Sequence, residues 1–284
     1  MQFPNALWAG DLLSSLVFSD GQAPVRTTRQ GLAGPQTLAS IDQGAPLRVL
    51  SLGDSITLGY NDPTENSYRR DLECLLWTGG NPVSMIGSVE SGDWDDNKVD
   101  AWVYHTIDEI WEKAEPELTR GSKGGSEQKP PNVILLHAGT VNLVLNKNVT
   151  TAPERLGALI DFITAHNPDA LLVVSQLIPY HNETVNSMVN TYNAQIPGVV
   201  AARARERKRL VLASMEGVTV DLLPDGVHPA GLGSSVMARR FYEAIVEADR
   251  RGLVIPAAGP FDDRGASSVL PSGRCSDAMA GEIE

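Results

Sequence analysis

The sequence predicts an α/β protein, organised as a three-layer α/β/α sandwich around a five-stranded parallel sheet. Short, continuously apolar runs recur along the chain, and such runs are typical of strands that are buried on both faces. Segments with helical spacing separate these runs, which indicates parallel strands joined by helices. The length of 284 residues and the hydrophobic content of 42% fit one large domain.

Composition divides the chain into three parts. Residues 1–46 have weak periodicity and scattered Gly, Pro, Gln and Thr, so we expect an irregular N-terminal extension. Residues 47–255 carry the alternating pattern and form the expected domain. Residues 256–284 are rich in Gly, Ser, Pro and Ala, which predicts a loosely ordered C-terminal tail.

Five apolar runs supply the predicted sheet. In order, the expected strands are residues 47–52, 83–86, 132–137, 171–178 and 210–214. Since ligands bind beyond the carboxyl ends of parallel strands, residues that directly follow these runs are the first candidates for a site.

Helical spacing marks the segments between the strands. The pattern is clear in residues 153–166, where Leu156, Leu159, Ile160 and Ile163 fall on one face. Pro197 is expected to kink or break the helix that contains it. The expected helices are residues 67–77, 107–118, 153–166, 186–208 and 231–251.

The charge balance excludes several classes of partner. A net charge of -12 and a pI of about 4.9 leave no basic surplus to neutralise phosphate, so we expect no nucleic-acid partner. The sequence contains no apolar run near the ~20 residues of a membrane span. The five histidines lack metal-binding spacing, so we expect neither a metal nor another cofactor.

Cysteines and sequons bear on the compartment. Cys74 lies in an apolar helical stretch and is interpreted as a buried small residue, while its pairing with Cys275 stays open. The triplets that begin at Asn148 and Asn182 would accept N-glycans in a secretory pathway. They favour a secreted, extracellular protein, although the first 20 residues lack the basic leading region of a signal peptide.

Gly53-Asp54-Ser55 directly follows the first predicted strand. A tight turn at this point would expose the Ser55 hydroxyl and its backbone N–H at the edge of the sheet. A serine at this place is equally typical of a helix N-cap. The segment alone does not decide between a nucleophile and a cap.

Asp225 and His228 stand three residues apart near the end of the domain. On one turn of chain the carboxylate could accept the imidazole Nδ1–H, which fixes the tautomer and leaves Nε2 as a base. Asp-Gly and His-Pro pairs also form ordinary surface turns. Together with Ser55, however, this pair completes the set for nucleophilic ester chemistry, and the sequence predicts a serine hydrolase.

These segments resemble the conserved blocks of the SGNH (GDSL-type) hydrolases. Gly53-Asp54-Ser55 resembles the first block and Asp225-x-x-His228 the last. The resemblance implies a flavodoxin-like fold for residues 47–255, with Ser55, His228 and Asp225 as the catalytic residues. It also implies an oxyanion hole made of the Ser55 N–H, the Gly87 N–H and one asparagine side chain.

The third block departs from the pattern of the family. The family usually has Gly-x-Asn-Asp, whereas this chain has Gly139-Thr140-Val141-Asn142. Val141 therefore replaces the oxyanion asparagine and cannot donate a hydrogen bond. Either Asn142 reaches the oxyanion through a local shift or the hole has two donors.

Within this family the chain resembles carbohydrate esterase family 3, which includes acetylxylan esterases. The loop that would border the site departs from their pattern and contains Trp102, Tyr104 and His105. These side chains could form a wall that stacks on sugar, or they could pack as ordinary amphipathic residues. Asp54, grouped with them beside the substrate, is expected to brace the nucleophile loop.

We therefore expect a serine esterase that hydrolyses small-acyl esters, acetyl esters first, of a small or polymeric carbohydrate. One alternative is a lipid or thioester hydrolase of the same fold. Another is a carbohydrate-binding protein whose catalysis is weakened by Val141. The oligomeric state is left open.

Overall fold

The computed structural model describes residues 38–120, 129–259 and 261. By its contacts the chain divides into two units, Met1–Gln36 and Thr37–Glu284. The first unit lies outside the described residues, and the account below concerns the second.

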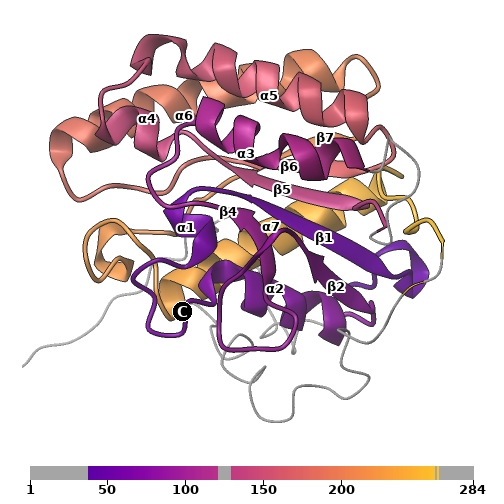
Figure 1. Ribbon diagram of the computed structural model, residues 1–284. Helices are drawn as coiled ribbons and strands as arrows, with labels where there is room; N and C mark the ends of the chain where they lie inside the picture. The colour runs from indigo at the N-terminus through magenta and orange to yellow at the C-terminus, as the bar shows by residue number, and fades with distance from the viewer. Residues whose placement is uncertain (1–37, 121–128, 260, 262–284) are drawn as a thin grey trace, which may run out of the picture. The chain divides into compact units, whose positions relative to one another are not determined.

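A seven-stranded sheet forms the centre of this unit (Figure 1). The central strand β1, Leu47–Gly53, pairs in parallel with β2, Val83–Ile86, with β4, Lys98–Ala101, and with β5, Val133–His137. Beyond β5, the strands β6 and β7 continue the parallel sheet, and the short β3 pairs antiparallel with β4. These last strands are β6, Leu171–Ser175, β7, Leu210–Ala213, and β3, Val89–Glu90.

Helices cover both faces of the sheet, which gives the three-layer α/β/α sandwich that the sequence predicted (Figure 1). One face carries α2, Ser67–Thr78, and α7, Leu232–Arg250. The other carries α3, Ile107–Arg120, α5, Ala152–His166, and α6, Glu183–Ala204. Because consecutive residues of β1 face opposite sides, Val49 joins the first core and Leu50 the second.

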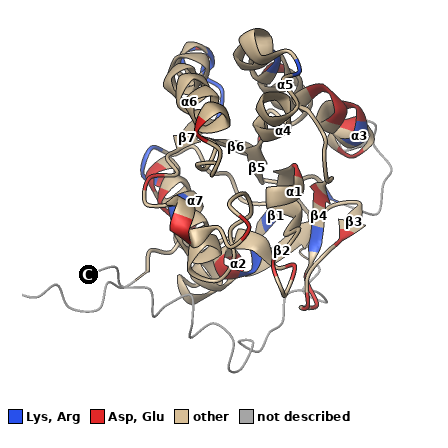
Figure 2. Cartoon of the chain, turned by 90° about the vertical axis from the view of Figure 1, so that its left-hand side faces the viewer, with Lys and Arg blue, Asp and Glu red and all other residues tan. Residues whose placement is uncertain are grey.

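The five predicted strands are confirmed, in chain order, as β1, β2, β5, β6 and β7, and the five predicted helices as α2, α3, α5, α6 and α7. The sequence did not predict β3 and β4. The reason is compositional, since Lys98–Ala101 alternates charged and apolar residues next to an acidic loop and lacks a continuous apolar run. Figure 2 shows acidic residues in β3 and α3 on this side of the sheet.

Pro197, which was expected to kink or break its helix, does not break it, because α6 continues through this residue to Ala204. A proline inside a helix leaves the carbonyl four residues earlier without its usual donor. Here the Asn193 carbonyl accepts a hydrogen bond of 3.5 Å from the Gln176 side chain, which offsets part of that loss.

Cys74 requires a correction, because it is disulfide-bonded rather than an unpaired small residue. Its apolar helical surroundings look the same in sequence whether or not the thiol is paired. Cys275, the other cysteine of the chain, lies outside the described residues.

The limits at residues 47 and 255 remain predictions, although short flanking segments contact the sheet unit. Ile41 is fully buried, and its N–H and C=O are both hydrogen-bonded to the Asn81 side chain. Ala258 accepts a hydrogen bond from Arg48 in β1. Most of the predicted tail lies outside the described residues.

Candidate active site

Ser55 stands at the carboxyl end of the central strand. It is the first residue of the short helix α1, Ser55–Leu58, and the N-cap is Asp54, whose carboxylate accepts the Ile56 N–H at 3.0 Å. As the first residue of a helix, Ser55 has a backbone N–H without an intrahelical acceptor. Of the two interpretations of this segment, the capping role therefore falls to Asp54.

The turn before Ser55 depends on close backbone packing. A Cβ on Gly53 would lie 2.3 Å from the Thr57 hydroxyl and 2.6 Å from the His137 carbonyl, so a side chain cannot fit. Glycine at this position lets the chain leave β1 sharply enough to start α1 at once.

His228 reaches Ser55 from the opposite end of the unit. Its Nε2 lies 3.0 Å from Ser55 Oγ, and its Nδ1 lies 2.7 Å from an Asp225 oxygen, Oδ2. The structure thus brings the three predicted residues together in the order serine, histidine, aspartate. Because Nδ1 faces a carboxylate, the neutral imidazole carries its proton there and presents Nε2 as an acceptor to the serine hydroxyl.

Asp225 is held as an ion by four donors. Burial raises the pKa of Asp225, but hydrogen bonds from the His228 N–H and ring, Asn61 and the Val227 N–H outweigh it and lower the pKa well below its usual range. Oδ1 accepts the backbone N–H groups of Val227 and His228 at 2.9 and 2.7 Å. Oδ2 accepts the His228 ring and the Asn61 amide, each at 2.7 Å.

Sequence reasoning missed two residues in the loop after α1. Asn61 binds Asp225 directly, and the ring of Tyr60 meets the His228 imidazole edge-on, with centroids 5.3 Å apart. Neither residue lies in a recognisable motif, and the loop has no periodicity. The left-handed φ of +62° at Asn61 is typical of asparagine in a turn and gives no sign of its contact with residue 225.

Gly87 follows β2, which pairs with β1 along residues 47–50. A Cβ on Gly87 would lie 2.4 Å from the Val99 backbone. The next residue, Ser88, donates both its N–H and its hydroxyl to Asp100 at 2.7 Å. The Gly87 turn is therefore fixed against β4 beside the end of β1.

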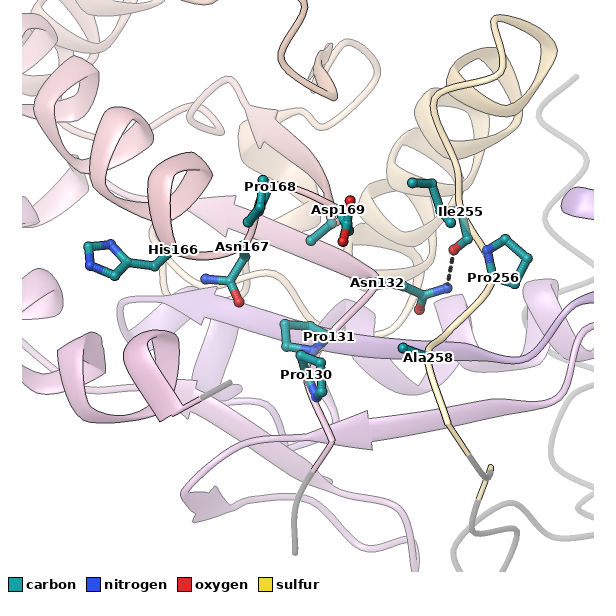
Figure 3. Close-up of a pocket in the computed structure, with 11 residues that line it drawn as sticks. Pro130, Pro131, Asn132, His166, Asn167, Pro168, Asp169, Ile255, Pro256 and Ala258 are labelled. Carbon is teal, nitrogen blue, oxygen red and sulfur yellow. Dashed lines mark hydrogen bonds between the residues drawn. The ribbon is translucent and has the colours of Figure 1, made fainter. Parts of the chain in front are cut away.

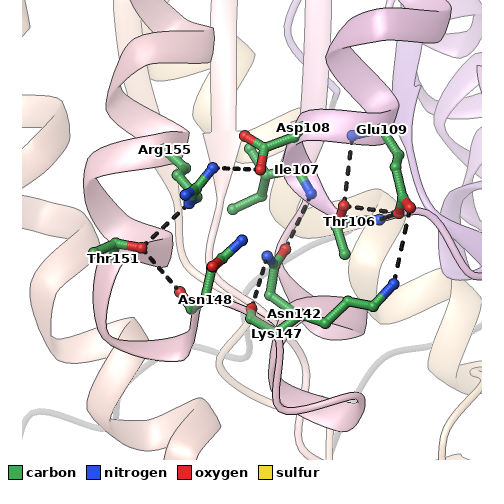
Figure 4. A network of polar contacts seen from close by, with 9 residues as sticks. All are labelled: Thr106, Ile107, Asp108, Glu109, Asn142, Lys147, Asn148, Thr151 and Arg155. Atoms are coloured by element: carbon green, nitrogen blue, oxygen red, sulfur yellow. Dashed lines mark hydrogen bonds and ion pairs between the residues drawn. The ribbon is translucent and has the colours of Figure 1, made fainter.

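The Asn142 side chain is hydrogen-bonded to backbone groups of two neighbouring segments, as Figure 4 shows. Its Oδ1 accepts the Ile107 N–H at 3.0 Å, and its Nδ2 donates to the Lys147 carbonyl at 3.1 Å. The side chain is fully buried in α4, Thr140–Val144, beside a nearly buried Val141. The expected contribution of Asn142 to an oxyanion hole is not supported, because these contacts aim its amide at the loop backbone.

Asp54 does not border a substrate space, which corrects its grouping with the substrate-contacting residues. It is fully buried, caps α1 and faces the equally buried His137, with Nδ1 and Oδ1 3.7 Å apart. Burial leaves it the bracing role that the sequence suggested.

The loop after β4 divides into a packed and an exposed part. Trp102 donates its backbone N–H to the Gly53 carbonyl at 3.2 Å, and its side chain packs against the core, which fits the structural alternative. Tyr104 is 68% exposed and has a left-handed φ of +63°. His105 is hydrogen-bonded through Nδ1 to the Val103 carbonyl and lies 6.0 Å from the Trp102 ring. Tyr104 is thus the member of the three that faces solvent.

A cavity of about 430 Å³ lies elsewhere (Figure 3). It is lined by Asn132, Asn167, Ala170 and several prolines, at the amino ends of β5 and β6. The serine stands at the carboxyl end of the sheet, so this cavity is not part of the candidate active site.

Within the described ranges, no cluster of three or more His, Cys, Asp or Glu side chains is arranged to hold a metal ion. No helix in the same part of the chain is long and apolar enough to cross a membrane. Both statements concern the described residues alone.

No family model matches the chain. A curated relative is the "Putative endoglucanase X" of Acetivibrio thermocellus, which is 28% identical over 136 residues. That match spans 46% of this chain and 58% of the relative, so the chain covers little more than half the length of this curated protein.

Solved structures match over most of their length. A family 3 carbohydrate esterase from Clostridium thermocellum is 25% identical with a TM-score of 0.62, covering 73% of this chain and 99% of that one. A carbohydrate esterase family 3 structure from Talaromyces cellulolyticus has 20% identity and a TM-score of 0.57, covering 72% and 99%. A member of the lipolytic G-D-S-L family from Veillonella parvula has 14% identity and a TM-score of 0.53, covering 71% and 99%. The latter two bear on the fold alone.

Proposed function

We propose that the chain, which is similar to family 3 carbohydrate esterases, is an SGNH (GDSL-type) hydrolase that acts as a serine esterase on small-acyl esters, acetyl esters first, of a carbohydrate. The observation that carries the proposal is the hydrogen-bonded series from Ser55 Oγ to His228 Nε2, at 3.0 Å, and from His228 Nδ1 to Asp225, at 2.7 Å. A lone serine hydroxyl is a weak nucleophile, and this series supplies the base that activates it.

Acyl transfer proceeds in two steps. His228 Nε2 takes the Ser55 proton while Oγ attacks the ester carbonyl, and the imidazolium then gives that proton to the departing alcohol. In the second step His228 takes a proton from water, and the hydroxide equivalent attacks the acyl-enzyme. The proton passes to Ser55 Oγ as the acid leaves. Asp225 stays ionised throughout and stabilises the imidazolium.

The oxyanion is held by two backbone donors, the N–H groups of Ser55 and Gly87. Asn142 is committed to Ile107 and Lys147, and Val141 has no donor. Loss of one oxyanion donor typically slows turnover by about 100 to 1,000-fold. This esterase is therefore intrinsically slower than a relative that has all three donors.

The carbohydrate part of the substrate rests on the similarity to family 3 carbohydrate esterases and on the exposed Tyr104, two residues after Trp102, whose backbone N–H is bonded to Gly53. An aromatic ring in this position offers a flat apolar face to a sugar. Trp102 serves as support for that loop rather than as a stacking surface.

An extracellular location fits this substrate. Cys74 is disulfide-bonded, and disulfides persist mainly in oxidising compartments. The sequon residues Asn148 and Asn182 are both exposed, as acceptors of N-glycans must be.

Hydrolysis of p-nitrophenyl acetate, butyrate and octanoate tests the proposal, with Ser55→Ala as the matched control. We expect acetate to be turned over fastest, no activity above background in Ser55→Ala, and release of acetate from acetylated xylan. A preference for octanoate would support a lipid or thioester hydrolase instead. Wild-type rates equal to those of Ser55→Ala on every ester would contradict the esterase and leave a binding protein.

A further inference from the structure

Asn61 lies in the loop after α1, and backbone hydrogen bonds connect this loop to Ser55. The N–H groups of Gly59 and Tyr60 both donate to the Ser55 carbonyl, at 3.1 and 3.0 Å, and the Asp62 N–H donates to Gly59. These backbone bonds close the turn without help from the Asn61 side chain. The position of Asn61 is therefore set relative to Ser55, while its amide is available for another partner.

That partner is the carboxylate of Asp225, which lies 164 residues away in sequence. Asn61 Nδ2 donates to Oδ2 at 2.7 Å, and a carboxylate partner requires the nitrogen of the amide to face it. Oδ2 is the same oxygen that accepts the Nδ1–H of His228. Of the four donors to Asp225, Asn61 alone comes from outside the turn at residues 225–228.

Sharing one carboxylate oxygen between two donors has two effects. It fixes the plane of the carboxylate, and with it the direction in which Nε2 of the imidazole points. It also withdraws part of the negative charge that would otherwise act on the imidazolium. The turn is held from the other side as well, since the His181 N–H donates to the Gly226 carbonyl at 2.9 Å.

We propose that Asn61 is a positioning residue for the acid–base pair, acting through Asp225 to keep His228 aimed at Ser55. This inference rests on the proposed esterase function. Asn61 then acts together with Ser55, His228 and Asp225. Its hydrogen bond connects the loop after α1 to the turn at residues 225–228.

Asn61→Gly tests the proposal, because glycine accepts the left-handed backbone of this position and removes only the amide. Asn146→Gly is the matched control, since Asn146 is exposed and also has a left-handed φ of +52°. We expect Asn61→Gly to lower kcat about tenfold, as is typical of losing a hydrogen bond to a charged group, with KM unchanged. The acid limb of the kcat/KM profile should move to higher pH, because the released carboxylate binds the imidazolium more strongly. Asn146→Gly should behave as the wild type.

Asn61→Asp tests whether the hydrogen bond or the volume of the side chain matters. It keeps the shape of the Asn61 side chain and replaces its N–H donor with a second carboxylate. It should lose more activity at neutral pH than Asn61→Gly, because like charges meet at Oδ2. The proposal is overturned if Asn61→Gly keeps the wild-type kcat and acid limb, if the control loses as much activity, or if the loss lies in KM alone.

A measurement without substrate keeps this inference separate from the esterase proposal. The downfield proton resonance of the His228 Nδ1–H should shift in Asn61→Gly and stay in place in Asn146→Gly. Absence of ester turnover in the wild type would contradict the proposed function, whereas an unmoved resonance in Asn61→Gly would contradict the role of Asn61.

Discussion

At the scale of single residues, the backbone of Val99 leaves no room for a side chain at Gly87. A Cβ would lie 2.4 Å from the Val99 backbone, a separation that no side chain can hold without moving the turn. We predict that Gly87→Ala lowers kcat by about 100-fold or more, since the turn carries one of two proposed oxyanion donors.

The control for Gly87→Ala is Gly198→Ala, because a Cβ at Gly198 meets no atom within 4 Å. Steady-state kinetics on p-nitrophenyl acetate and thermal midpoints should be measured on both variants. A Gly87→Ala protein that is folded and fully active would contradict the assignment of the oxyanion donor.

Asp225 carries a second prediction at this scale. Asp225→Asn keeps the size of the side chain but replaces a charged acceptor, so the imidazole tautomer is no longer fixed and the imidazolium loses its counter-charge. We expect kcat to fall by about 1,000 to 10,000-fold with little change in KM. In the wild type, the pKa of Asp225 is lowered by its donors, so its stabilising contribution is present above pH ~4 and is lost only as pH falls further. An Asp225→Asn enzyme with nearly wild-type kcat would mean that another group orients the base.

At the scale of elements, the position of Asn142 in the short helix α4 gives its side chain a structural role. Asn142 connects α4 to the start of α3 and to the loop after α4 through Ile107 and Lys147. We predict that Asn142→Leu lowers the free energy of unfolding by about 2–4 kcal/mol, because it leaves the buried Ile107 N–H and the part-buried Lys147 carbonyl without their partner. The activity of the folded fraction should stay within about threefold of the wild type.

Lys147→Ala is the control for Asn142→Leu, since it removes a half-exposed side chain whose ion pair with Glu109 spans 3.9 Å and leaves the carbonyl that Asn142 uses. Its effect should stay within about 1 kcal/mol. Urea denaturation and initial rates at equal folded concentration give both quantities. A 100-fold loss of activity in folded Asn142→Leu would instead restore Asn142 to the oxyanion hole.

Comparison of the helices and strands with the sequence shows which parts of the fold could be predicted. The five parallel strands were predicted because burial on both faces requires uninterrupted apolar residues, as in Val133–His137. The short strand Lys98–Ala101 carries charges and was missed. Ser55, Asp225 and His228 were predicted as a set because the chemistry demands those side chains next to turns, and the structure places them in hydrogen-bond contact. Asn61 was not, since its role depends on a contact across 164 residues that no local pattern encodes.

At the scale of the whole molecule, two buried carboxyl groups make stability depend on pH. Burial, followed by the charge of Asp96, raises the pKa of Glu73 to about 8. Burial also raises the pKa of Asp96 to about 7, against the opposing Met85 N–H and the Lys98 charge. Unfolded, both groups titrate near pH ~4, so the folded protein binds more protons between pH ~4 and ~8. The free energy of unfolding should therefore fall as pH rises through this window.

Thermal midpoints at pH 5, 6.5 and 8 test this dependence. We expect the midpoint to fall with rising pH and the slope to be reduced in Glu73→Gln, which cannot ionise. Glu112→Gln on the exposed face of α3 should keep the slope of the wild type. A midpoint that rises from pH 5 to 8, or parallel curves for Glu73→Gln and the wild type, would contradict the prediction.

The hydrogen bond between Ser55 and His228 joins residues that are 173 positions apart, with six strands of the sheet between them along the chain. During synthesis Ser55 leaves the ribosome long before its proposed base, His228, has been added to the chain. A nascent or truncated chain that stops before residue 225 carries the hydroxyl but nothing to activate it. Under the proposed mechanism, ester cleavage can therefore begin only after the chain has been made and folded as far as His228.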